Sequence, residues 1–168
     1  MIDIRRSWGQ IALLVLALVG VGISIYLTSV HYDNAPLVCS ASGVVDCARV
    51  LASPYSVVPG TTIPISVPGL LWCIVMGALA FTAWRILPER RSVLIAELVW
   101  ALSGIVTVLY LVFVELVRLH TICAWCTGLH AIILAMLLIT VVQVQRTSAV
   151  MEEVDEEEEK PAIVPRRG

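Results

Sequence analysis

The chain has 168 residues, of which 59% are hydrophobic and only 14% are charged, and its mean hydropathy is +0.93. This composition is far more apolar than that of a water-soluble domain and indicates a membrane protein. At roughly 20 residues per helical crossing, the length allows a handful of spans and excludes a fused soluble enzyme. The formal net charge of -2 combines a slightly basic region 1–150 with an acidic segment 151–168.

Long apolar stretches with few charges predict an all-α integral membrane protein, a bundle of four transmembrane helices. An extracytoplasmic loop with a short helix is expected between the first two spans. The expected membrane domain covers 1–150, and we expect 151–168 to be a disordered, acidic cytoplasmic tail. The expected bounds are about 8–30, 67–87, 92–117 and 121–145 for the four helices and 31–66 for the outer loop.

The arginines outside the spans predict the orientation. The opposite ends of the spans carry only Arg49 and Arg118. The positive-inside rule therefore places both termini in the cytoplasm and the loop 31–66 outside, where disulfides form and persist. The cytoplasmic arginines are Arg5, Arg6, Arg85, Arg90, Arg91 and Arg146.

Two of the five cysteines form the motif Cys123-Ala124-Trp125-Cys126 at the outer end of the fourth span. A cysteine at a helix N-terminus gains thiolate character from the free backbone N–H groups and the helix dipole. Cys123, Cys126 and His130 share one helix face. A zinc site built from these three and His120 is the alternative. The spacing and the oxidising compartment favour redox chemistry.

Cys39 and Cys47 form a second pair, in the outer loop. Residues 42–51 are expected to form a short amphipathic helix with Ser42 as its N-cap, which directs Cys47 toward the membrane body. Cys39 lies before it, where an external partner can reach it. The pair alone is typical of a structural staple, but together with the C-x-x-C motif it predicts a relay in which Cys47 meets Cys123.

A dithiol at the edge of an apolar bundle can pass two electrons to a lipid-soluble quinone. His130, one turn below Cys126, is placed to hydrogen-bond a quinone carbonyl or to supply a proton. The alternative is a histidine that only hydrogen-bonds a neighbouring helix.

The ordered motifs over roughly residues 8–145 resemble the vitamin K epoxide reductase family, in the form of a prokaryotic single-domain homologue without a fused thioredoxin-like domain. The resemblance rests on Cys39 and Cys47, on Ser53 six positions after Cys47, and on the C-x-x-C motif of the fourth span. The loop leading into the second helix is also similar, in Ser53-Pro54-Tyr55, Gly60, Ile63-Pro64 and Pro68-Gly69.

This resemblance implies a four-helix bundle around a quinone of the ubiquinone, menaquinone or vitamin K type, with no metal. Cys126 would lie next to the ring with Cys123 as its disulfide partner, and Ser53 would lie near the quinone end of the path. Cys47 would carry electrons inward, and Cys39 would accept them from a thioredoxin-like partner. The catalytic set is then Cys39, Cys47, Cys123 and Cys126, with Ser53 supporting, and the quinone-binding set is Cys126, His130 and Ser53.

Two positions depart from the vertebrate pattern: His130 stands where those members have Tyr, and Ile65 lies about where they have a quinone-binding Asn. Both departures favour reduction of a plain quinone. Reduction of vitamin K epoxide or vitamin K quinone, as in the vertebrate enzymes, is the alternative.

The expected activity is that of an oxidoreductase that forms disulfides and uses a quinone as acceptor. Its partners would be a separate, DsbA-like thiol protein on the outer side, the quinone pool and the lipid bilayer, with no nucleic acid. The expected location is a prokaryotic plasma membrane, crossed several times, with the cysteine pairs on the extracytoplasmic side.

Two other classes remain open at this point. One is a metal-binding membrane protein that uses the His120, Cys123, Cys126 and His130 set, and the other is a scaffold with two stapling disulfides. A DsbB-like protein is less consistent with the order of the motifs, because its second cysteine pair lies between spans three and four.

Three further residues receive no functional role from the sequence. Cys73 within the second span is expected to pack as a small hydrophobe. Glu97 and Glu115 share one face of the third span, and interfacial solvation is the expected state of both.

Overall fold

The computed structural model describes residues 2–33, 35–39, 42–87 and 90–159. Four of its helices are long and apolar enough to cross a membrane, which confirms the expected all-α four-span bundle. They are α1 (Ile2–Asp33), α3 (Ser66–Phe81), α4 (Arg91–Phe113) and α5 (Ala124–Glu159). Two π-helical turns extend α3 and α4, namely η2 (Thr82–Ile86) and η3 (Val114–Leu119).

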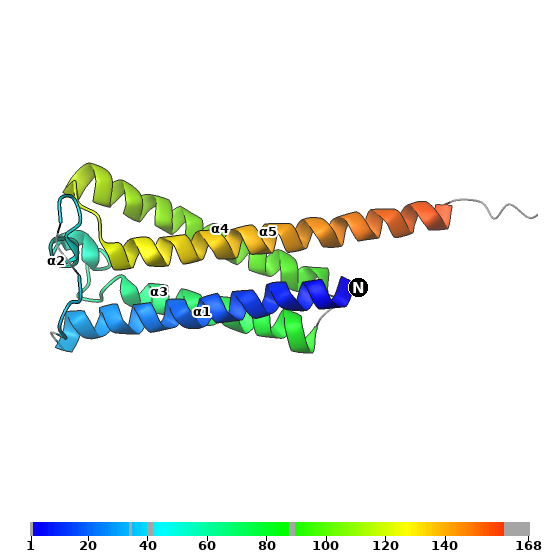
Figure 1. The fold of residues 1–168 in the computed structure, drawn as a ribbon, viewed down its shortest axis with the longest axis horizontal. Coiled ribbons are helices and arrows are strands. Elements are labelled where there is room, and N and C mark those ends of the chain that lie inside the picture. Colours follow the sequence, from blue (N-terminus) through cyan, green and yellow to red (C-terminus); the bar gives the residue numbers. More distant parts are fainter. Residues whose placement is uncertain (1, 34, 40–41, 88–89, 160–168) are drawn as a thin grey trace, which may run out of the picture.

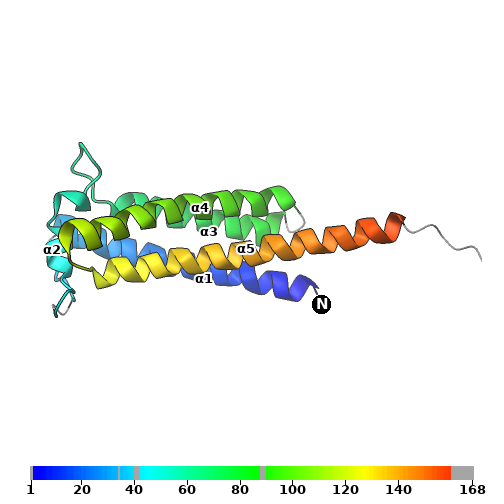
Figure 2. The same cartoon turned by 90° about the horizontal axis from the view of Figure 1, so that it is seen from above.

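The four helices run up and down along one long axis, with α1 beside α3 and α4 beside α5 (Figures 1 and 2). A short helix, α2 (Cys47–Leu51), and a single 3-10 turn, η1 (Pro54–Ser56), cover one end of the bundle. The start of α1 and the end of α5 lie at the opposite end. The segments that carry the four motif cysteines therefore gather at one end of the molecule.

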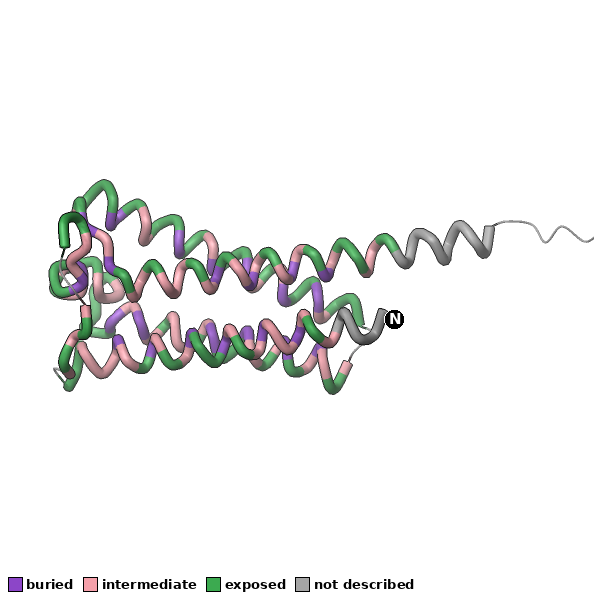
Figure 3. Tube along the Cα trace, in the orientation of Figure 1, coloured by how far each residue is buried: buried purple, intermediate pink, exposed green. Residues whose placement is uncertain are grey.

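Small side chains let the helices approach closely, as is usual in membrane bundles. Gly104 of α4 is the clearest case, because a Cβ there would lie 2.5 Å from Cζ2 of Trp72. Trp72 and Trp100 are stacked and donate hydrogen bonds to each other's backbone oxygen, at 3.2 and 3.1 Å. Buried residues follow the inner faces of the helices (Figure 3). The central core consists of Leu13, Ala17, Met76, Ala80, Ala101 and Met136.

A polar cluster lies in the bundle at the end opposite α2. Gln10 of α1 donates from its Nε2 to Glu97 of α4 at 3.1 Å and to the Gln143 amide oxygen of α5 at 2.7 Å. Glu97 is fully buried. The expected interfacial solvation of Glu97 is therefore wrong, because its face of α4 is the one that packs into the bundle.

The helix α5 continues to Glu159, so 151–159 are helical where the sequence suggested a disordered tail. Glutamate has a good helix propensity, and a helix that is already formed extends without a new nucleation cost. The remainder of the expected tail, residues 160–168, lies outside the described residues.

Candidate active site

The outer-loop cysteines form a disulfide, Cys39–Cys47, with a Cα separation of 6.2 Å. Cys47 is the first residue of α2 and is buried, whereas Cys39 is half-buried. Asp46 caps α2, since its side chain accepts a hydrogen bond from the Arg49 N–H at 3.0 Å. An oxygen that accepts from the third backbone N–H of a helix is the usual N-cap arrangement.

The expected N-cap at Ser42 is therefore wrong, and α2 is shorter than the expected helix 42–51. Ser42 instead forms a tight turn with Val45, in which each backbone N–H donates to the other's carbonyl at 3.0 Å. Gly43 in this turn has a φ of 58°, a left-handed conformation that glycine adopts without strain. The turn leaves Val44 exposed rather than on a buried stripe.

Backbone pairing joins this loop to the segment before α5. Asp46 N donates to Ile122 O at 3.1 Å, and Ile122 N donates to Val44 O at 2.8 Å, which forms a short parallel bridge between Val45 and Ile122. Each of the bonded residues Asp46 and Ile122 directly precedes a cysteine. The bridge therefore places Cys47 and Cys123 in one buried cluster, against which Cys39 and Cys126 pack.

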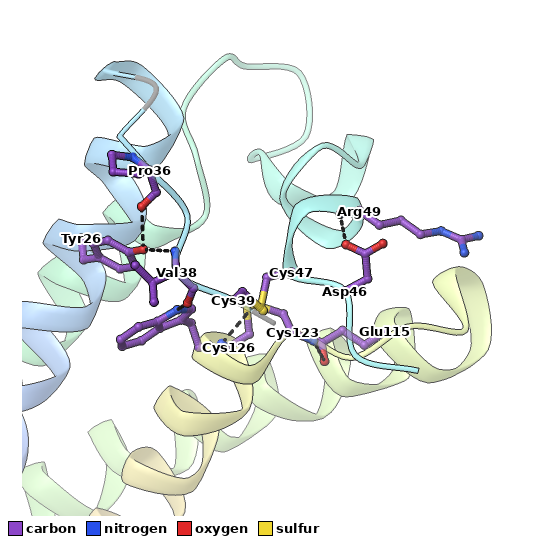
Figure 4. The surroundings of a disulfide bond; sticks show 11 residues. Tyr26, Pro36, Val38, Cys39, Asp46, Cys47, Arg49, Glu115, Cys123 and Cys126 are labelled. Atoms are coloured by element: carbon purple, nitrogen blue, oxygen red, sulfur yellow. Dashed lines mark hydrogen bonds between the residues drawn. A yellow bond between two sulfur atoms is a disulfide. The ribbon is translucent and has the colours of Figure 1, made fainter. Parts of the chain in front are cut away.

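Figure 4 shows the Cys39–Cys47 disulfide beside Cys123 and Cys126. The segment before Cys39 is held from two sides. The Tyr26 hydroxyl donates to Pro36 O at 3.1 Å and accepts from Val38 N at 2.8 Å, and Trp125 Nε1 donates to Val38 O at 2.9 Å. The rings of Tyr26 and Trp125 lie 4.9 Å apart. Trp125, inside the C-x-x-C motif, thus positions the outer cysteine pair.

The C-x-x-C pair begins α5. Cys123 precedes the first residue of the helix, and its Sγ accepts a hydrogen bond from the Cys126 N–H at 3.3 Å, so its sulfur takes the place of an N-cap oxygen. Hydrogen bonding from the Cys126 side chain lowers the pKa of the Cys123 thiol, against the opposing effects of burial and of the Glu115 carboxylate. Both residues are thiols here, not a disulfide. Cys123 is buried, and Cys126 is only partly so.

Glu115 lies against this pair, and no motif pointed to it. Its carboxylate accepts a hydrogen bond from Cys123 N at 3.4 Å, and Glu115 and Cys126 line the same small cavity. The exposed fraction of Glu115 is 6%, so the expected interfacial solvation is wrong. A sequence signal for the burial of Glu115 was available: it shares one helix face with Glu97, and the small residues Ala101 and Gly104 lie between them on that face.

An apolar cavity of about 380 Å³ opens between the helices below the cysteines. All four spans and the outer loop contribute to its wall. Cys126 and His130 both line it, and so does Ile65. Trp72 and Gly104 also line it. A cavity of this size, mostly apolar with a few polar groups, suits a small aromatic ligand.

Ser53 does not line this cavity. Its hydroxyl donates to Val50 O at 2.7 Å, and Ser53 lines a smaller cavity of about 40 Å³ together with Cys126, Glu115 and Tyr55. Cys126 lines both cavities, the larger one with His130 and the smaller one with Ser53.

The four proposed metal ligands do not form a common site. His120 is exposed and has a φ of 49°, which ends the η3 turn. Within residues 2–33, 35–39, 42–87 and 90–159, no group of three or more His, Cys, Asp or Glu side chains is arranged to hold a metal ion. Cys73 is buried in α3 and is not part of the buried cluster that contains the other cysteines.

No curated protein matches the chain, but the model of the vitamin K epoxide reductase family matches residues 11–141. That range contains the second and third spans, most of the first and fourth, both cysteine pairs and His130. The family also implies redox chemistry in general. The chain therefore belongs to the vitamin K epoxide reductase family and is a multi-pass membrane oxidoreductase.

Proposed function

We propose that the chain oxidises the dithiol of an extracytoplasmic thioredoxin-like protein and passes the two electrons to a membrane quinone. The observation that carries this proposal is the position of Cys126. It packs against the buried cluster of Cys47, Val50 and Cys123 and also lines the apolar cavity. The Cys123–Cys126 dithiol, which carries two electrons, therefore lies between the outer cysteine pair and the cavity that can hold a lipid-soluble acceptor.

Each step exchanges one dithiol for one disulfide. The partner dithiol reduces the Cys39–Cys47 disulfide and is itself oxidised through a mixed disulfide with Cys39. The freed Cys47 thiolate attacks Cys123 of an oxidised Cys123–Cys126 pair, and Cys39 then closes back onto Cys47. The reduced Cys123 and Cys126 thiols pass two electrons to the quinone, which becomes a quinol, and they return to a disulfide.

The wall of the cavity favours a plain quinone over an epoxide as acceptor. His130 and Ile65, the two positions that depart from the vertebrate pattern, both line it. His130 can donate a hydrogen bond to a quinone carbonyl. Ser53 acts indirectly in this proposal, because it holds the end of α2 through Val50.

The arrangement of the charges supports the proposed orientation. The end of η2 with Arg85, the start of α4 with Arg91, the start of α1 and the end of α5 lie at the end of the bundle opposite α2. By the positive-inside rule this end is cytoplasmic, so both cysteine pairs face the oxidising compartment of a prokaryotic plasma membrane.

The test uses purified protein, a reduced thioredoxin-like protein and a short-chain quinone, with quinol formation followed by absorbance. We expect the native chain and Cys73→Ala to form quinol and Cys126→Ala to form none. Cys73 is the matched control, because it is a buried cysteine outside the cluster that contains the two cysteine pairs. Equal rates in Cys126→Ala and Cys73→Ala would show that the proposed path is wrong. A parallel assay with the quinone epoxide tests the alternative acceptor.

A further inference from the structure

Glu115 is a buried carboxylate in direct contact with the redox pair, and the relay described above does not use it. It lies in the π-helical turn η3, next to the equally buried Val114. Its carboxylate faces the first turn of α5, where it accepts a hydrogen bond from Cys123 N (Figure 4), and Glu115 and Cys126 line the same small cavity. A carboxylate at this depth is costly, so its position beside the redox pair indicates a role for its proton affinity.

The two cysteines of the pair differ in how their thiols can lose a proton. The Cys123 sulfur receives the Cys126 N–H and lies at the positive end of α5, which favours its thiolate. Cys126 lies within the first turn and its own backbone N–H is already used by Cys123. The proton of the Cys126 thiol must therefore pass to another group before its sulfur can form a bond.

We propose that Glu115 is the general base that takes the Cys126 proton when the Cys123–Cys126 disulfide forms. This role rests on the proposed function, in which that disulfide forms as the quinone is reduced. Cys123 reacts as its thiolate, after its own proton has passed to water. The Cys126 S–H bond breaks, the proton moves to the Glu115 carboxylate, and a sulfur–sulfur bond to Cys123 forms. The two electrons reduce the acceptor quinone to a quinol, which takes up two protons from water.

The smaller cavity gives the proton an exit. Cys126 and Glu115 line it together with Ser53 and the exposed Tyr55, which brings it to the outer loop. Cys126 and Tyr55 are the titratable side chains that line this space with Glu115, and Cys123 contacts Glu115 through its backbone. The Cys39–Cys47 disulfide has no thiol proton to offer.

The experiment measures closure of the Cys123–Cys126 disulfide in the fully reduced full-length chain, from pH 6 to pH 10, in two arms. One arm uses a short-chain quinone, and the other uses glutathione disulfide, which closes the pair without any quinone. The variants are Glu115→Gln, Glu115→Asp and the matched control Glu97→Gln, which makes the same change at a buried glutamate of α4 far from the cysteines.

We expect Glu115→Gln to slow closure by roughly 100-fold near neutral pH, which is in the range of general base catalysis. The deficit should shrink as the pH rises, because hydroxide then replaces the missing base. Glu115→Asp should recover part of the rate, and Glu97→Gln should stay within about twofold of native. Glu115 acts on the chemical step, so the KM for quinone should change little.

Two results would overturn the proposal. One is closure in Glu115→Gln at or above the native rate, since a neutral side chain would then help Cys126 only by removing a nearby negative charge. The other is a loss that is equal at every pH, which indicates a structural role. If the native chain does not reduce quinone but Glu115→Gln slows closure by glutathione disulfide, the proposed function fails and the role of Glu115 stands.

Discussion

The backbone N–H of Asp46 donates a hydrogen bond to the carbonyl oxygen of Ile122 at 3.1 Å. This bond ties the residue before Cys47 to the residue before Cys123, although 76 positions separate them in the chain. The same bond fixes the start of α2 against the start of α5. The proposed transfer between the two cysteine pairs depends on this connection.

The first prediction concerns that transfer. In a chain with Cys39→Ala and Cys126→Ala, mild oxidation should join Cys47 to Cys123, because the two cysteines lie in one buried cluster. Peptide mass spectrometry identifies the crosslink. The control pair, Cys39→Ala with Cys123→Ala, leaves Cys47 and Cys126, and we expect a markedly lower yield there. Equal yields would mean that the bridge at Ile122 does not select Cys123.

The second prediction concerns the acidity of Cys123. Because its pKa is lowered mainly by the hydrogen bond from the Cys126 side chain, its thiolate should persist to lower pH than that of an ordinary cysteine. The midpoint of the pH dependence of alkylation measures this, while the absolute rate reports access to a buried sulfur. Cys126→Ala removes the side-chain donor and should move the midpoint to higher pH. An unchanged midpoint would assign the effect to the helix terminus alone.

The third prediction concerns the N-cap of α2. Asp46→Ala removes the acceptor for the Arg49 N–H and should cost about 1 kcal/mol of local stability. Asp46→Asn keeps an oxygen at the same place and should cost only a few tenths. Thermal unfolding in detergent compares the two variants. If both lower the melting temperature equally, the carboxylate acts through its charge and not through the cap.

The fourth prediction concerns close packing of the spans. Gly104→Ala places a Cβ 2.5 Å from the Trp72 ring, and overpacking of this kind costs about 1–3 kcal/mol. Gly22→Ala in α1 is the matched control, because nothing lies within 4 Å of the added Cβ and alanine has the better helix propensity. We expect a lower melting temperature for the first variant and an equal or higher one for the second.

The sequence predicted the four spans and the identity of the cysteine pairs, because both signals are local. Span length follows from apolar runs, and the C-x-x-C motif at the start of α5 follows from spacing. The prediction of Ser42 as the N-cap of the short helix is wrong, because serine and aspartate are comparable caps and the sequence gives no clear sign of the turn at Gly43.

The pairing of Val45 with Ile122 could not be predicted, since two short segments far apart in the chain leave no periodic pattern. The burial of Glu115 was missed for a related reason. Its face of the helix was identified, but whether that face meets lipid, water or neighbouring helices depends on the packing of the whole bundle. The position of Glu115 beside Cys123 and Cys126 is a consequence of that packing.

The most direct test of the central claim is the stoichiometry of the full reaction. Purified chain in lipid vesicles is given a reduced thioredoxin-like protein and a quinone, and both products are quantified in the same sample. The account predicts one quinol for each partner disulfide formed, with both products lost in Cys126→Ala. Partner oxidation without an equal amount of quinol, or unchanged rates in Cys126→Ala, would contradict it.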